Sequence, residues 1–157
     1  DQQHAVSTLF NLVNVPSAVW IDEEGFVRRI DEGAYATVHQ MGTFEFGRED
    51  YAPMVRAWVE KGDHVLPPRE VAKQLTARTP DVALAEPTFK LGVYFFRTGD
   101  EERANRYWEQ AQKLNPDSWN YHRQDWSFTP TEAGANWLRK VQSLGDKPYY
   151  RPIEGLD

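Results

Sequence analysis

Apolar positions follow two different spacings along the chain. In most of it they recur every three to four residues, the spacing of a helix that buries one face. This spacing predicts helices over residues 5–12, 51–61, 69–78, 86–97, 101–114, 118–125 and 130–144. Residues 17–21 are instead a nearly continuous apolar run, typical of a strand buried on both faces. A turn at residues 22–25 and a second strand over 26–30 complete a predicted β-hairpin.

Breaker residues separate these elements. Gly62 ends the helix over 51–61, and Pro67 begins a linker. Residues 33–47 show neither period, so we expect them to be mostly loop. Residues 146–157 are rich in proline and glycine and are expected to form an extended tail.

The two central helices resemble a tetratricopeptide repeat, a helical hairpin of about 34 residues. With Ala85 as the first position, the small, apolar, aromatic and proline positions of the repeat fall on Leu91, Gly92, Phe95, Ala104, Trp108, Ala111 and Pro116. Thr88 departs from the pattern, because the repeat carries an aromatic residue there. Gly92 and Ala104 are expected to allow close helix approach, with Trp108 filling the space above them.

The same resemblance implies a protein-binding groove on the first helix of the pair. Carried over position by position, the residues that face a bound ligand are Glu86, Phe89, Val93, Phe96 and Arg97. An ordinary helical hairpin that happens to match the pattern is the alternative.

The N-terminal part resembles the C-terminal half of a thioredoxin-like domain of the TlpA/ResA or peroxiredoxin-like kind. The matching residues are Phe-Asn-Leu-Val-Asn-Val-Pro-Ser at 10–17, followed by 19–27. The resemblance implies a cis bond before Pro16, a β-hairpin, and a last helix over 51–61 that covers the sheet. It also implies that Val15 and Pro16 form a substrate-facing loop, in which the Val15 backbone pairs with a bound substrate strand. A hairpin flanked by helices, with a trans Val15–Pro16 bond, is the alternative.

The chain departs from that family in one large respect, because its 157 residues include no cysteine. Without cysteine there is no thiol nucleophile, disulfide or metal–thiolate site. The reactive half of the family's domain, which comes first in the chain, is absent from this sequence. A hairpin without that half keeps one strand edge unpaired. Three alternatives stay open: the missing half was removed, another chain supplies it, or this chain pairs with itself.

The charge and composition of the chain disfavour several classes of partner and ligand. The net charge is −6, which disfavours nucleic acid and anionic membrane surfaces as partners. The four histidines lack the spacing of metal ligands, and no phosphate-binding or dinucleotide fingerprint occurs, so we expect no metal and no cofactor. No apolar run is long enough to span a bilayer, and the N-terminus lacks the features of a signal peptide. The compartment stays open, with the cytoplasm slightly favoured.

An aromatic cluster in residues 119–128 is the most unusual stretch. Trp119, Tyr121 and Trp126 could form a recognition surface or a platform on which sugars stack. Burial of these rings as a cap on the open end of the repeat is the interpretation we favour, since a single repeat cannot bury its apolar face alone.

We therefore expect an α+β fold: a truncated thioredoxin-like hairpin unit over 1–66, a tetratricopeptide-like helical unit over 67–145, and a tail over 146–157. The expected function is a protein-interaction module of a thioredoxin-like protein that binds a protein or peptide, as a homo-oligomer or with another chain. The alternative is part of a thiol–disulfide oxidoreductase or peroxide-handling enzyme whose cysteines lie elsewhere.

Overall fold

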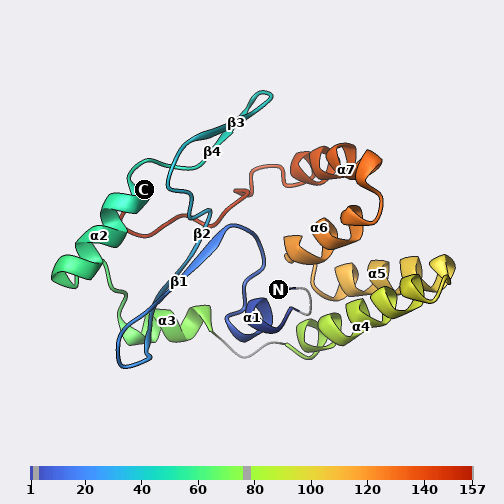
Figure 1. Cartoon of the computed structure of the whole chain (residues 1–157), viewed down its shortest axis with the longest axis horizontal. Coiled ribbons are helices and arrows are strands. Elements are labelled where there is room, and N and C mark those ends of the chain that lie inside the picture. The colour runs from blue at the N-terminus through green and yellow to red at the C-terminus, as the bar shows by residue number, and fades with distance from the viewer. Residues whose placement is uncertain (2–3, 76–78, 157) are drawn as a thin grey trace. The chain divides into compact units, whose positions relative to one another are not determined.

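The fold is mixed helix and sheet, mostly helical, and comes from a computed structural model that describes residues 1, 4–75 and 79–156. Figure 1 labels its elements in chain order. They are α1 (Ala5–Leu9), β1 (Ser17–Ile21), β2 (Val27–Glu32), β3 (His39–Met41), β4 (Phe44–Phe46), α2 (Tyr51–Lys61), α3 (Pro68–Gln74), α4 (Pro80–Arg97), α5 (Glu101–Leu114), α6 (Trp119–Ser127) and α7 (Pro130–Gln142).

These elements form two compact units, each built from two chain segments. The helical unit comprises Asp1–Val13 and Ala77–Lys147, and the hairpin unit comprises Asn14–Thr76 and Pro148–Asp157. This division differs from the expected boundaries at 66 and 145. The difference arises because residues 4–13 pack on helices α4 and α6, whereas the C-terminal residues pack on the hairpin.

The core of the helical unit lies between α4 and α5, where Ala85, Phe89, Ala104, Trp108 and Ala111 are buried with Tyr121 of α6. The expected close approach at Gly92 is confirmed. A Cβ atom placed there would lie only 2.4 Å from Cδ1 of Trp108. Glycine is therefore required at this position by the indole ring and not by the backbone angle.

Helix boundaries in this unit follow their caps. Asp100 accepts a hydrogen bond from the backbone N–H of Arg103 at 2.9 Å, as expected of the residue that begins α5. Helix α4 begins at Pro80, earlier than expected, because Thr79 Oγ1 accepts from the Val82 N–H at 3.3 Å and Pro80 occupies the first turn. The expected end of α3 at residue 78 lies outside the described residues.

The hairpin unit contains the predicted antiparallel pair β1–β2. Val19 lies opposite Ile30, Trp20 opposite Arg29, and the register shifts between Trp20 and Ile21. The Val15–Pro16 peptide bond is cis, as the resemblance implied. Trp20 packs against Tyr51 and Met54 of α2, so this helix covers one face of the hairpin.

Two segments carry structure that the sequence-based expectations did not include. Residues 33–47 are mostly loop, as expected, but they also contain β3 and β4, which pair as a second antiparallel hairpin. Residues 148–156 are not a free tail, because Ile153 is 4% exposed in the same core as Trp20. The tail is irregular in backbone, yet burial of one isoleucine fixes it to the sheet.

A buried ion pair also holds this C-terminal segment. Arg29 is 2% exposed and pairs with Asp31 at 2.7 Å. Its two terminal nitrogens donate to the carbonyl oxygens of His64 at 3.0 Å and Glu154 at 2.5 Å. The Tyr51 hydroxyl donates to Asp31 at 3.0 Å. Both carboxylate oxygens of Asp31 therefore accept hydrogen bonds.

Three tryptophans differ in their burial. Trp108 is buried, whereas Trp58 and Trp137 are half-buried. Trp58 stacks on Trp20 with ring centroids 4.8 Å apart.

Candidate functional site

The outer edge of β2 is closed by the side chain of a glutamine. The amide of Gln74, at the end of α3, accepts from the Ile30 N–H at 3.2 Å and donates to the Ile30 carbonyl at 2.9 Å. The Leu66 N–H donates to the Arg28 carbonyl at 3.1 Å on the same edge. The glutamine amide thus makes the two bonds that a neighbouring strand would make, and it blocks strand addition there.

The outer edge of β1 is open. In an antiparallel ladder, successive residues direct their N–H and C=O groups alternately toward one neighbour and the other. Because Ile30 faces outward from β2, its partner Val19 faces outward from β1, and so does Ile21 at the same period. Within residues 14–75 and 148–156, the structure gives no hydrogen-bond partner to the outward backbone groups of Val19 and Ile21. No charged side chain lies within β1 to discourage pairing.

The predicted substrate-facing loop lies next to this open edge in sequence, but its backbone is already engaged. The Val15 N–H donates to Asn14 Oδ1 at 2.9 Å, and the Val15 carbonyl accepts from the Tyr150 hydroxyl at 2.9 Å. The Val15 side chain is 45% exposed. Pairing of a substrate strand with Val15 would first require Tyr150 to leave, whereas pairing with Val19 would not.

The predicted groove of the helical unit is occupied by the chain's own residues. Phe89 is 2% exposed and stacks against His4 and Tyr121 at 5.4 and 5.0 Å between ring centroids. Glu86 accepts from the Thr8 hydroxyl at 2.7 Å. Residues 4–8 therefore cover the position that the resemblance assigned to a ligand.

The other groove residues divide between core and surface. Val93 and Phe96 are half-buried against the core, and Phe96 packs on Phe128 at 4.5 Å between centroids. Arg97 is exposed. The structure does not bring these five residues together as one open surface.

The aromatic cluster is divided in the same way. Trp119 and Tyr121 are 5% and 6% exposed, which agrees with burial as a cap. Lys140 lies over the Trp119 ring at 4.8 Å, so α7 covers this residue. Trp126 is half-buried and packs on His122.

A polar cleft between α6 and α7 contains three groups with shifted pKa values. It is lined by His122, Asp125, Trp126, Arg139 and Lys140, among others. Burial, together with the nearby Lys140 ammonium, lowers the pKa of His122 to about 4, so the ring is neutral at pH 7. Burial also raises the pKa of Asp125 and lowers that of Lys140. Both charged groups are paired within the chain: Gln112 donates to Asp125 at 2.8 Å, and Lys140 to the Pro116 carbonyl at 3.2 Å.

Sequence reasoning did not identify Gln74 as a functional residue. The only sign in the sequence was a polar amide three residues after Val71, on the face of α3 that Val71 buries. Helical periodicity treats such a residue as an ordinary surface position.

Over the described ranges, the structure contains no cluster of three or more metal-ligating side chains. None of the described helices has the length and hydropathy needed to cross a bilayer. Comparison with known proteins gave no match to a protein-family model, a curated protein or a solved structure.

Proposed function

We propose that this chain is a protein-interaction module that accepts an extended segment of a protein or peptide as an added antiparallel strand on β1. The observation that carries the proposal is the difference between the two edges of one hairpin. The Gln74 amide closes the edge of β2, and the edge of β1 offers outward N–H and C=O groups at Val19 and Ile21. Strand addition to an exposed sheet edge is a common mode of peptide recognition.

The resemblance to a thioredoxin-like domain supports the same edge. The order of Pro16 loop, hairpin and covering helix α2 matches the C-terminal half of such a domain. We propose that the module belongs to a thioredoxin-like protein, and that either another chain or a second copy supplies the added strand.

A second candidate is part of a thiol–disulfide oxidoreductase or peroxide-handling enzyme whose cysteines lie on a preceding segment or another chain. The exposed Val15 side chain next to the open edge favours it. Reading the coding sequence upstream of Asp1 tests this candidate. A cysteine pair spaced as CxxC supports the enzyme, and a cysteine-free region contradicts the version in which a preceding segment supplies the cysteines.

Amide hydrogen exchange on the full chain tests strand addition. The probe is a synthetic peptide of alternating valine and threonine, compared with the same peptide carrying a central proline. We expect the alternating peptide to slow exchange at Val19 and Ile21, with no change at Ile30, whose N–H already bonds to Gln74. The proline peptide should have no effect. Protection that appears at Ile30, or that is absent at Val19, contradicts the proposal.

A further inference from the structure

Helix α4 carries an apolar stripe on the face opposite its buried one. Leu84, Leu91 and Tyr94 are 51%, 44% and 59% exposed. Pro87 lies on the same stripe and is also exposed. The spacing between the four residues alternates between three and four, the pattern with which one helix packs along another. The opposite face of α4, with Ala85, Phe89 and Gly92, is already filled by the core.

This stripe differs from the scattered apolar residues found on any protein surface. Isolated exposed leucines need no explanation, but a continuous stripe along one helix does. The helical spacing of this stripe fits an amphipathic helix as its binding partner. A strand would be a poorer fit, because it presents its side chains with a period of two.

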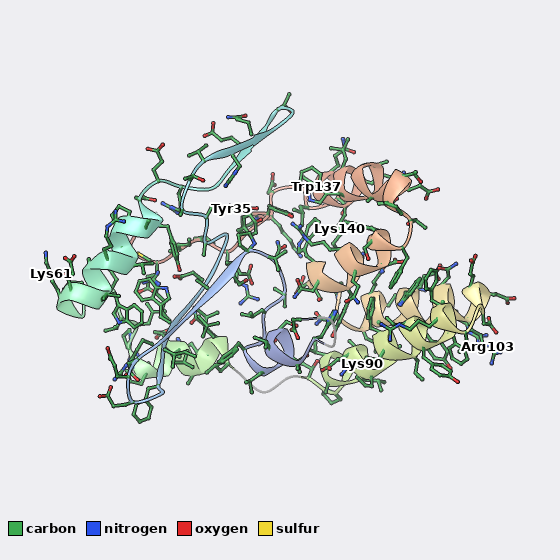
Figure 2. All side chains as sticks on the ribbon, in the orientation of Figure 1. Tyr35, Lys61, Lys90, Arg103, Trp137 and Lys140 are labelled. Atoms are coloured by element: carbon green, nitrogen blue, oxygen red, sulfur yellow. The ribbon has the colours of Figure 1, made fainter. Side chains whose placement is uncertain are left out.

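Basic side chains flank the stripe. Lys90 and Arg97 lie on one side of it, seven residues apart, and both are exposed. Lys90 pairs with Glu86 at 2.6 Å, but its side chain is 51% exposed and that of Glu86 only 14%, so the ammonium is the charge that faces solvent. Figure 2 labels Lys90 beside α4.

A third cation lies on the other side of the stripe. Arg103, from the start of α5, lies over the Phe95 ring at 4.5 Å, and Figure 2 shows it at the far end of the helix pair. The C-terminal half of the stripe thus has arginine on both sides, although Arg103 is also paired with Asp100 at 2.5 Å.

The charges beside the stripe distinguish between two possible partners, a second copy of this chain and a helix of another protein. If two copies of the chain met antiparallel through the same stripe, the two-fold axis would lie near residue 89, so Lys90 of one copy would face Lys90 of the other and like charges would repel. A helix with carboxylates beside its apolar seam would instead meet these cations with opposite charge.

We propose that the outer face of α4 docks an amphipathic helix of another protein whose apolar seam is flanked by glutamate or aspartate. Leu84, Pro87, Leu91 and Tyr94 form the seam, and Lys90 and Arg97 select the charge of the partner. This site is independent of the β1 edge.

The test is fluorescence anisotropy of a labelled three-heptad peptide (about 21 residues) added to the full chain. The peptide carries leucine at the seam and glutamate at both flanking positions. A matched peptide carries lysine at those flanking positions. Both peptides repel themselves, so neither forms a coiled coil that would compete. We expect the glutamate peptide to bind about tenfold more tightly than the lysine peptide.

Matched variants assign the binding to this face. We expect Leu91→Ser and Arg97→Glu each to weaken binding of the glutamate peptide about five- to tenfold. Leu138→Ser on α7 and Lys61→Glu on α2 make the same chemical changes elsewhere and should have no effect. Exchanging both cations, Lys90→Glu with Arg97→Glu, should make the chain prefer the lysine peptide. Circular dichroism confirms that each variant is folded.

Three results would overturn the proposal. The first is that neither peptide binds at up to about 200 µM. The second is that both peptides bind equally. The third is that sedimentation shows a dimer that Leu91→Ser dissociates, which would assign the stripe to a second copy. Val19→Pro should leave peptide binding unchanged, so failure at the β1 edge and failure at α4 are distinguishable.

Discussion

Two glycines inside helices, Gly92 of α4 and Gly134 of α7, differ in what surrounds them. A Cβ at Gly92 would lie 2.4 Å from Trp108, whereas one at Gly134 would meet nothing within 4 Å. Trp108 is 3% exposed, so the indole has little room to move. The same substitution should therefore have opposite effects at the two sites.

We expect Gly92→Ala to lower the free energy of unfolding by about 1–3 kcal/mol, because the overlap with Trp108 exceeds the gain in helix propensity. Gly134→Ala should raise it by about 0.5–1 kcal/mol. Urea denaturation of the two variants and the parent chain measures both changes. A neutral Gly92→Ala would mean that α4 and α5 can separate without cost.

Adjacent residues of β1 should differ in their tolerance of proline. Ala18 lies opposite Asp31 and directs its N–H into the β1–β2 ladder, whereas Val19 directs its N–H outward. We expect Ala18→Pro to destabilise the chain by about 3 kcal/mol, and Val19→Pro by about 1 kcal/mol or less, as for proline on an edge strand. Thermal unfolding compares the two. Equal losses would show that Val19 is not an edge residue.

At the scale of elements, helices were predictable wherever the apolar period agreed with a local cap or break. The helix over 101–114 is an example. Gly99 and Asp100 define its start, and the stripe of apolar residues that ends at Ala111 indicates how far it extends. The strands of 33–47 were missed because each is only three residues long, too short to establish a period of two. The burial of Ile153 was missed because it depends on a contact with residues more than 90 positions away in the sequence, which no local pattern encodes.

The candidate site was predictable only in part. The Val15–Pro16 loop and the hairpin could be located from sequence, because proline and the apolar run are local signals. Two features could not be predicted from sequence: the hydrogen bonds by which Gln74 closes the edge of β2, and the hydrogen bond from Tyr150 to the Val15 carbonyl. Both depend on side-chain hydrogen bonds between segments distant in sequence.

The α6–α7 pair should make stability depend on pH through His122. Its folded pKa of about 4 lies below the ordinary 6.5, so between these values the unfolded chain binds more protons than the folded one. The free energy of unfolding should therefore fall as the pH falls from about 6.5 toward 4. Asp125, whose pKa burial raises, opposes part of this loss.

His122→Gln isolates the contribution of the imidazole. We expect the variant to lose less stability than the parent chain between pH 7 and pH 4, as measured by urea denaturation at each pH. Parallel pH profiles for the two proteins would show that His122 is not buried as described.

For the whole molecule, the absence of cysteine sets an expectation about activity. We expect the chain by itself neither to reduce insulin disulfides nor to consume peroxide, because both reactions need a thiolate and the two methionines cannot replace one. Activity of a pure sample above the buffer control would contradict this. Addition of a cysteine-bearing thioredoxin-like protein provides the positive control.

If β1 accepts a strand as proposed, the glutamine at the end of α3 limits how far the resulting assembly can grow. A hairpin with one open edge is monovalent: once a strand is added to β1, nothing remains on β2 to receive another. Gln74→Ala would make the hairpin divalent, and divalent units with complementary edges polymerise rather than close. We expect this variant, unlike the parent, to show light scattering that rises with time and concentration. Under the proposed strand addition, the Gln74 amide and the Leu66 N–H thus limit the hairpin to one added strand.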